Sequence, residues 1–309
     1  MPPLARGDVR NLVRKLGAHA RPAQQKQALA TIAAMIAAAG AIPPLVQLLE
    51  EASAAKVRGS AAGAVQNLAY FAENVVTISA AGAIPPLVQL LGPGCSADMQ
   101  LYAAGALHNL AQTADNKVTI PAAGAISPLV QLLGPGSTAL LQENAAVTLL
   151  RLALDTNNQV AIAAAGAIPS LVQLLGPGSS AAVQKEAAGA LMNLAENTGN
   201  QVTISAAGAI SPLVLLLGPG SLLEVQRFAA GALGNLPQNT GNQVAIAAAG
   251  AIPPLVQLLR RGSADLPKAC AACALEALGR NNAKNCATIA AAGASADVGV
   301  LEEMERLGI

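Results

Sequence analysis

The sequence predicts an all-α chain built from short three-helix segments that repeat along its length. Three observations support this prediction: a glycine motif recurs at constant spacing, Gly and Pro interrupt each segment at the same places, and large side chains are scarce. Hydrophobic residues make up 53% of the chain but aromatic residues only 1%. Alanine favours helices and fills little space, so an Ala-rich interior suits closely packed helices.

The glycine of an Ala-Gly-Ala-Ile motif returns every 42 residues, a period typical of helical repeats. Its six occurrences are Gly40, Gly82, Gly124, Gly166, Gly208 and Gly250. A seventh glycine, Gly293, follows 43 residues later in Ala-Gly-Ala-Ser.

Each repeat begins with a short helix and continues with a second one. In the fourth occurrence, residues 158–165 form the first helix, with Asn158 expected as its N-cap and Gly166 as a left-handed C-cap. Residues 168–175 form the second helix. It has Pro169 in its first turn and apolar residues at i, i+3, i+4 and i+7, which predict one buried stripe.

A Gly-Pro-Gly turn at residues 176–178 separates the second helix from a longer third helix, which we expect Ser179 to cap. No Gly-Lys-Ser/Thr follows the turn, so it does not predict a phosphate-binding loop. In the fifth repeat, Pro237 should end the third helix at Leu236. The expected core stripe of the third helix in the fourth repeat is Val183, Ala187, Leu191 and Leu194.

The ends of the chain differ from the middle. We assign residues 1–36 to an N-terminal half-repeat, 37–284 to six full repeats and 285–309 to C-terminal cap helices. Residues 9–17 align with a second helix and residues 24–35 with a third. Polar caps protect a terminal repeat from water. We therefore expect solvated caps and a monomer. Because the first cap is basic and the last acidic, head-to-tail self-association is the alternative.

Charge and composition narrow the function classes. Eighteen basic and seventeen acidic residues leave a net charge of +1, which argues against a nucleic-acid partner. Every long apolar stretch is interrupted by Gly, Pro or polar residues, so we expect no membrane span. Four cysteines are too few for a disulfide framework, and we expect reduced thiols in the cytoplasm or the nucleus.

The sequence contains no convincing catalytic set. His19 and His108 are far apart and have no paired carboxylates, so we expect no enzyme activity and no cofactor. Cys270 and Cys273 share a helix face, but a metal site needs further ligands. We expect these two cysteines to be small buried residues.

One third-helix position lies off the core stripe in every repeat. Its residues are Asn67, Asn109, Arg151, Asn193, Asn235 and Ala277. The residues four and eight positions before it share that face. We call this recurring position the ladder position, because it predicts a row of polar side chains.

The repeated Ala-Gly-Ala-Ile-Pro-Pro-Leu-Val-Gln-Leu-Leu and Ala-Ala-Gly-Ala-Leu-x-Asn-Leu-Ala segments resemble the armadillo repeat family, over about residues 33–282. The units look most like plant and algal armadillo proteins, including the repeat regions of U-box ubiquitin ligases. The resemblance implies a right-handed α-solenoid of three-helix repeats that binds proteins. It also implies that third helices line a groove in which an Asn amide holds the backbone of an extended peptide. The alternative is an Asn that only satisfies neighbouring backbone groups.

The chain departs from importin-α-like receptors, which place Trp four residues before the Asn to hold Lys or Arg. Here that position holds Gly63, Gly105, Val147, Gly189, Gly231 and Cys273, so we expect no nuclear-import receptor. The glycines leave open a second interpretation, in which a helix lies close to them. Duplication of one unit would also explain them.

Charged residues on the same face suggest the ligand's character. Eight positions before the ladder position stand Glu143, Lys185 and Arg227. With Arg151, the two later residues form a basic stretch, so we expect a protein or peptide ligand with acidic residues. Two other functions stay open: the substrate-recognition region of a ubiquitin ligase, and an engineered consensus-like array.

Overall fold

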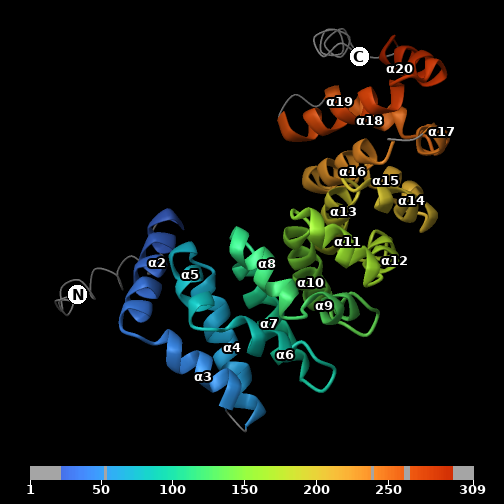
Figure 1. Cartoon of the computed structure of the whole chain (residues 1–309). Helices are drawn as coiled ribbons and strands as arrows, with labels where there is room; N and C mark the ends of the chain where they lie inside the picture. The colour runs from blue at the N-terminus through green and yellow to red at the C-terminus, as the bar shows by residue number, and fades with distance from the viewer. Residues whose placement is uncertain (1–21, 52–53, 238–239, 261–264, 295–309) are drawn as a thin grey trace. The chain divides into compact units, whose positions relative to one another are not determined.

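The computed structural model describes residues 22–51, 54–237, 240–260 and 265–294, and within these ranges every regular element is a helix (Figure 1). The predicted all-α class is therefore confirmed. The chain divides into two compact units, Met1–Pro128 and Leu129–Ile309. The division falls inside α9 (Ile126–Leu132). Each unit is described here by itself.

Unit 1 repeats the predicted order of a first, a second and a third helix. Its helices are α2 (Pro22–Ala38), α3 (Ile42–Glu51), α4 (Ala55–Ala69), α5 (Ala72–Ala80), α6 (Ile84–Gln89), α7 (Ala97–Leu110) and α8 (Ala114–Ala122). The third helices α4 and α7 pack against each other. α2 is one continuous helix that extends past the predicted 24–35 at both ends. The rest of the predicted half-repeat lies outside the described residues.

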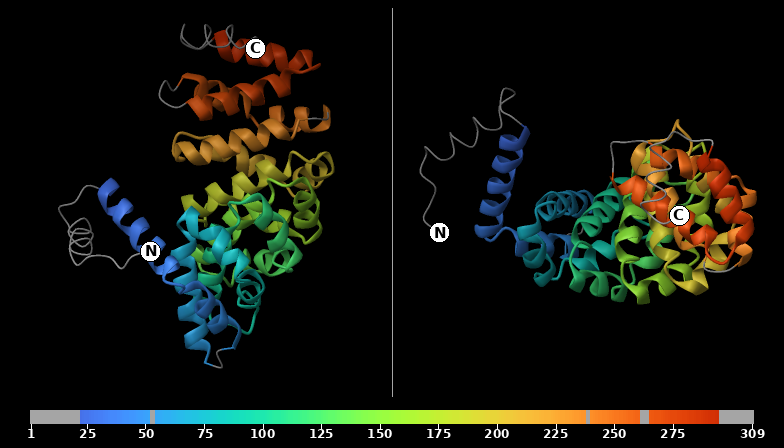
Figure 2. Two further views of the ribbon diagram at one scale, coloured as in Figure 1. Left: turned by 60° about the vertical axis from the view of Figure 1, so that its left-hand side comes forward. Right: turned by 90° about the horizontal axis from the view of Figure 1, so that it is seen from above.

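Unit 2 continues the same order. Its helices are α10 (Ala139–Leu152), α11 (Thr156–Ala164), α12 (Ala167–Leu174), α13 (Ala181–Leu194), α14 (Thr198–Ala206), α15 (Ile210–Leu216), α16 (Leu223–Asn235), α17 (Thr240–Ala248), α18 (Ile252–Arg260), α19 (Asp265–Gly279) and α20 (Ala283–Ala294). The third helices α10, α13, α16 and α19 contact one another in chain order (Figure 2). Residues 295–309 of the predicted C-terminal cap are not among those described.

The predicted left-handed glycines are confirmed at all six places of the 42-residue motif, with φ between 79° and 84°. Such a φ favours glycine, which has no Cβ. After Gly208 the chain turns by 87° between α14 and α15. The seventh glycine, Gly293, lies inside α20 and is not among the glycines with positive φ. The last Ala-Gly-Ala segment therefore continues the helix.

Three of the third helices, α7, α10 and α13, begin at a hydroxyl cap, and in α13 this cap lies one residue later than predicted. Ser180, not Ser179, caps α13, because the Ser180 hydroxyl accepts a hydrogen bond from the Val183 N–H. Ser179 instead closes the Gly-Pro-Gly turn, where its N–H donates to the carbonyl of Gly176 at 3.1 Å. In the fifth repeat α16 ends at Asn235, one residue before the expected Leu236.

The sequence predicted that the repeated first-helix Asn caps its own helix, and this prediction is wrong. Asp155 caps α11, and its carboxylate accepts from the N–H groups of Asn157 and Asn158. Asn158 is buried, and its amide donates to the Leu152 carbonyl at the end of the preceding third helix at 3.0 Å. Asn74, Asn116, Asn200, Asn242 and Asn285 make the equivalent bond. These amides satisfy carbonyls that a helix end leaves unpaired.

The core runs along the third helices where the apolar pattern predicted it. All four stripe residues of α13 are fully buried: Val183, Ala187, Leu191 and Leu194. The stripe combines Val, Leu and one small Ala, so adjacent third helices pack closely. Their remaining surface carries the candidate site.

Candidate functional site

The ladder positions lie on successive third helices, one per helix. Unit 1 contributes Asn67 from α4 and Asn109 from α7, and the other four residues come from unit 2. Their exposure differs. Asn67 is exposed and Asn109, Arg151 and Asn235 are half-buried, whereas Asn193 retains only 3% of its surface. An extended ligand would therefore find these amides unequally accessible.

Three ladder Asn side chains hold adjacent third helices together. Asn109 donates to the carbonyl of Gln66 at 3.0 Å, and Asn193 donates to that of Leu150 at 2.9 Å. Asn235 repeats the bond to Met192 at 3.0 Å. These bonds give the Asn a structural role within the chain. They use one amide N–H, and a primary amide also has a second N–H and a carbonyl oxygen for a ligand.

The glycines four positions before the ladder are covered by side chains of the same chain. A Cβ on Gly63 would lie 3.6 Å from the Tyr102 ring, and one on Gly189 would lie 3.2 Å from the Phe228 ring. Gln66 covers Gly105, and Met192 covers Gly231. In this structure the small residues therefore give room to neighbouring side chains rather than to a second helix.

Two aromatic residues on this face escaped the sequence analysis. Tyr102 and Phe228 both lie seven positions before a ladder residue, and each covers the glycine of the preceding third helix. The other residues at this position are Ser60, Asn144, Glu186 and Cys270. Their variation within an otherwise repetitive sequence was the available signal.

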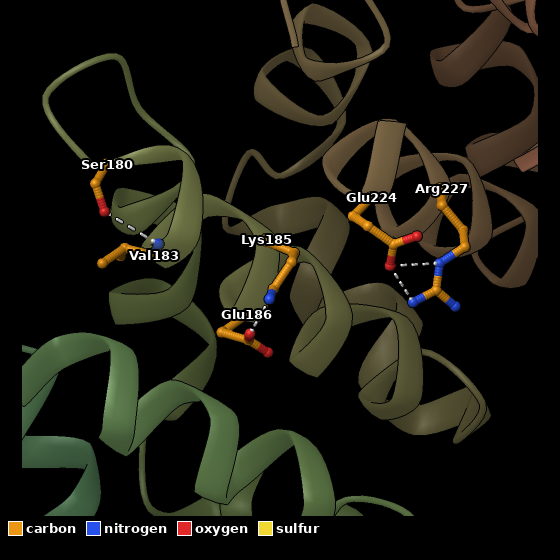
Figure 3. Close-up of polar contacts among 6 residues, drawn as sticks. All are labelled: Ser180, Val183, Lys185, Glu186, Glu224 and Arg227. Atoms are coloured by element: carbon orange, nitrogen blue, oxygen red, sulfur yellow. Dashed lines mark hydrogen bonds and ion pairs between the residues drawn. The ribbon is translucent and has the colours of Figure 1, made fainter. Parts of the chain in front are cut away.

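The predicted basic stretch is largely neutralised within unit 2. Lys185 Nζ lies 2.7 Å from Oε1 of Glu186, whose side chain is only 9% exposed. Arg227 pairs with Glu224 through two nitrogens, at 3.2 and 2.8 Å (Figure 3). The Arg227 guanidinium also lies 4.0 Å from the centre of the Phe228 ring. A ligand carboxylate would compete with these internal partners.

Arg151 differs from the other two cations. No described residue forms a hydrogen bond or close ion pair with its guanidinium. Burial lowers the pKa of Arg151, and the charge of Glu186 opposes this shift. Glu143, two turns before it on α10, is half-buried. Arg151 is therefore a partly desolvated cation whose five N–H donors have no partner in the described part of the chain.

Unit 1 contains an open cavity of about 470 Å³ between the starts of α4 and α7. The cavity arises because Gly59 and Ser60 occupy positions at which the next repeats carry residues with longer side chains. Its lining is Ala55, Lys56, Gly59, Ser60, Ser96, Asp98, Met99 and Tyr102. The lining mixes both charges with hydroxyls, so it does not define one ligand chemistry.

The cysteines form no metal site among the described residues, where no group of three or more His, Cys, Asp or Glu converges. Cys273 is exposed, contrary to the expectation that it is buried, because its position faces away from the core. Cys270 is half-buried, and burial raises the pKa of its thiol. His108 is half-buried, and His19 lies outside the described residues.

Similarity to known proteins agrees with the fold. The Armadillo/beta-catenin-like repeat family matches residues 31–70, 71–112, 113–154 and 155–196, more than half of the chain. The protein therefore belongs to the armadillo repeat family. Comparison with curated proteins found no match, and nothing supports the expected likeness to plant and algal members.

Solved structures similar to the chain include engineered proteins. One engineered protein has 33% identity and a TM-score of 0.79, over 97% of this chain and 77% of its own. A computationally designed armadillo repeat protein for modular peptide recognition has 32% identity and a TM-score of 0.69, over 76% and 99% of the two chains. A designed armadillo repeat protein in complex with the peptide (KR)4 has 31% identity and a TM-score of 0.68, over 77% and 99%.

Among the described helices, no single one is long and apolar enough to cross a membrane, although three sharply bent pairs meet the criteria of length and composition.

Proposed function

We propose that this protein is a non-catalytic scaffold that binds an extended segment of a partner protein along its third helices. The main supporting observation is the ladder of amides: Asn67 is exposed, and half-buried Asn109 and Asn235 each keep a second N–H and a carbonyl oxygen beyond the interhelical bond. An amide matches the donor and acceptor of a peptide unit, whatever the ligand's side chains. The designed armadillo proteins with a peptide-recognition purpose support this assignment.

We also propose that the ligand is a protein segment with acidic residues rather than a nucleic acid. A net charge of +1 gives little attraction for a polyanion. Arg151, Lys185 and Arg227 instead supply single positive charges on the third helices of unit 2, and those of Lys185 and Arg227 are shared with Glu186 and Glu224.

A displayed library of random 12-residue peptides, selected on the full chain, tests the proposed function. Asn67 suits the test because it is exposed and its side chain forms no interhelical hydrogen bond with a described residue. Asn67→Ala should weaken the binding of peptides to unit 1, and Asn235→Ala should weaken the binding of peptides to unit 2. Because a lost hydrogen bond costs about 0.5–1.5 kcal/mol, we expect a roughly two- to tenfold rise in Kd.

The controls are Thr77→Ala and Thr203→Ala, which change exposed residues of the first helices α5 and α14. Neither should alter the Kd in fluorescence polarisation. The proposed function is contradicted if the library yields no peptide. It is also contradicted if the selected peptides bind both Asn variants as tightly as they bind the parent.

For location and assembly, we propose a monomer in the cytoplasm or the nucleus. All four cysteines are free, in keeping with a reducing compartment. Imaging of the tagged protein tests the location, and sedimentation at low and high salt tests the monomer. A secretory location or a salt-dependent oligomer contradicts this assignment.

A further inference from the structure

Arg151 occupies the ladder position of the third repeat, where four other repeats carry Asn. Among the described residues, none satisfies the hydrogen-bonding capacity of its guanidinium. A guanidinium offers five N–H donors in a planar fork that matches a carboxylate. Partial burial makes such a pairing stronger than it is at an exposed surface. The side chain can thus pair with an anion that the described residues do not supply.

The surrounding charges leave Arg151 available. Glu186 is the acidic residue whose charge reaches Arg151, but its carboxylate is already paired with Lys185 at 2.7 Å. The three side chains together carry one net positive charge. Arg227, the other cation on this face, is held by Glu224 and by the Phe228 ring. Arg151 is therefore the cation of this group that gains most from an acidic ligand residue.

An apolar surface lies over α13, which is the next third helix after α10, the helix that carries Arg151. Leu150 of α10 and Phe228 of α16 meet over Gly189 of α13, from the two sides of that helix. Both side chains are half-buried and keep some exposed surface. Packed helices are about 8–10 Å apart, and an extended chain advances about 3.3 Å per residue. Two to three ligand residues therefore span the distance from α10 to α13.

We propose that unit 2 recognises an extended segment in which an acidic residue is followed or preceded, two or three positions away, by a large apolar residue. The acidic side chain pairs with Arg151, and the apolar side chain packs on Leu150 and Phe228. This inference rests on the proposed function, because it assumes that the ligand lies along the third helices. It adds the residue that sets the register of the ligand.

The displayed 12-residue library tests the motif when it is selected in parallel on the parent protein and on Arg151→Asn. This variant introduces the residue that four other repeats carry, so we expect it to fold, which circular dichroism checks. Peptides selected on the parent should contain the acidic–apolar pair. On the variant, the acidic preference should disappear while the apolar preference remains. A synthetic peptide with the pair should bind the variant about tenfold more weakly.

Further variants separate charge from packing. Phe228→Ala should remove the apolar preference and keep the acidic one. Arg280→Asn is the matched control, since Arg280 is 57% exposed and lies outside the ladder; its selected peptides should equal those of the parent. An acidic preference that survives in Arg151→Asn overturns this inference alone. A parent protein that selects no peptide overturns the proposed function and the inference together.

Discussion

At the scale of residues, buried amides stabilise the ends of helices at the same place in each repeat. The first-helix Asn donates to the end of the preceding third helix, and in four repeats a third-helix Gln does the same for the second helix. Gln184, for example, donates to the carbonyls of Leu175 and Gly176 at 3.3 and 2.9 Å. Carbonyls that would otherwise be buried without a partner are thereby satisfied.

Replacing Asn158 with Ala should lower the free energy of unfolding by about 1–3 kcal/mol, because the buried Leu152 carbonyl loses its donor. The neighbouring Asn157 provides a matched control, since it is exposed and only its backbone bonds to Asp155. Asn157→Ala should change stability by less than about 0.5 kcal/mol. Urea denaturation followed by circular dichroism measures both. Equal effects would contradict the structural role of Asn158.

The sequence predicted residue conformations better than residue partners. The left-handed glycines were predictable because a positive φ depends on the residue's own Cβ. The role of Asn158 was not, since Asn is favoured at an N-cap and also donates to distant carbonyls. Asp155, three residues earlier, was the available sign that the cap was already occupied.

At the scale of helices, glycine sets how closely two third helices approach. A Cβ on Gly234 of α16 would lie 3.3 Å from the Cα of Ala274 in α19, and that neighbour is backbone. A Cβ on Gly63 of α4 would make only ordinary contact with the Tyr102 ring. The two glycines therefore respond differently to the same substitution.

Gly234→Ala should lower the free energy of unfolding by roughly 1 kcal/mol, because α16 and α19 must move apart. Gly63→Ala should raise it by about 0.5–1 kcal/mol, because alanine favours a helix and fits the available space. Thermal and urea denaturation compare the two variants. Stabilisation by both would show that the approach of α16 to α19 is not limited by Gly234.

The candidate site was only partly predictable at this scale. The ladder positions followed from helical periodicity, and the structure places one on each third helix. Tyr102, Phe228 and the pairing of Lys185 with Glu186 did not follow, because they depend on which side chain fills the space beside a neighbouring helix. Periodicity gives the direction of a side chain, but it does not give its partner.

At the scale of the whole molecule, both tyrosines, Tyr70 and Tyr102, belong to unit 1, and the chain has no Trp. Tyrosine fluorescence therefore reports on unit 1, whereas far-ultraviolet circular dichroism reports on helices throughout the chain. In a repeat array each repeat contacts only its neighbours, so distant parts need not unfold together.

Asn158→Ala, in unit 2, should shift the urea midpoint seen by circular dichroism and leave the tyrosine midpoint nearly unchanged. Asn116→Ala removes the equivalent bond in unit 1 and should shift both. Coincident shifts of both signals in each variant would indicate that the chain unfolds as one cooperative body.

The amide bonds to backbone carbonyls have a consequence for how such a chain changes its length. Asn109, Asn193 and Asn235 each reach the carbonyl 43 residues earlier, whether that residue is Gln, Leu or Met. A main-chain acceptor is present whatever the side chain, so a repeat that carries this Asn can follow any other. Gain or loss of one 42-residue segment by recombination between copies would preserve these joints, and single positions such as Arg151 could then diverge freely.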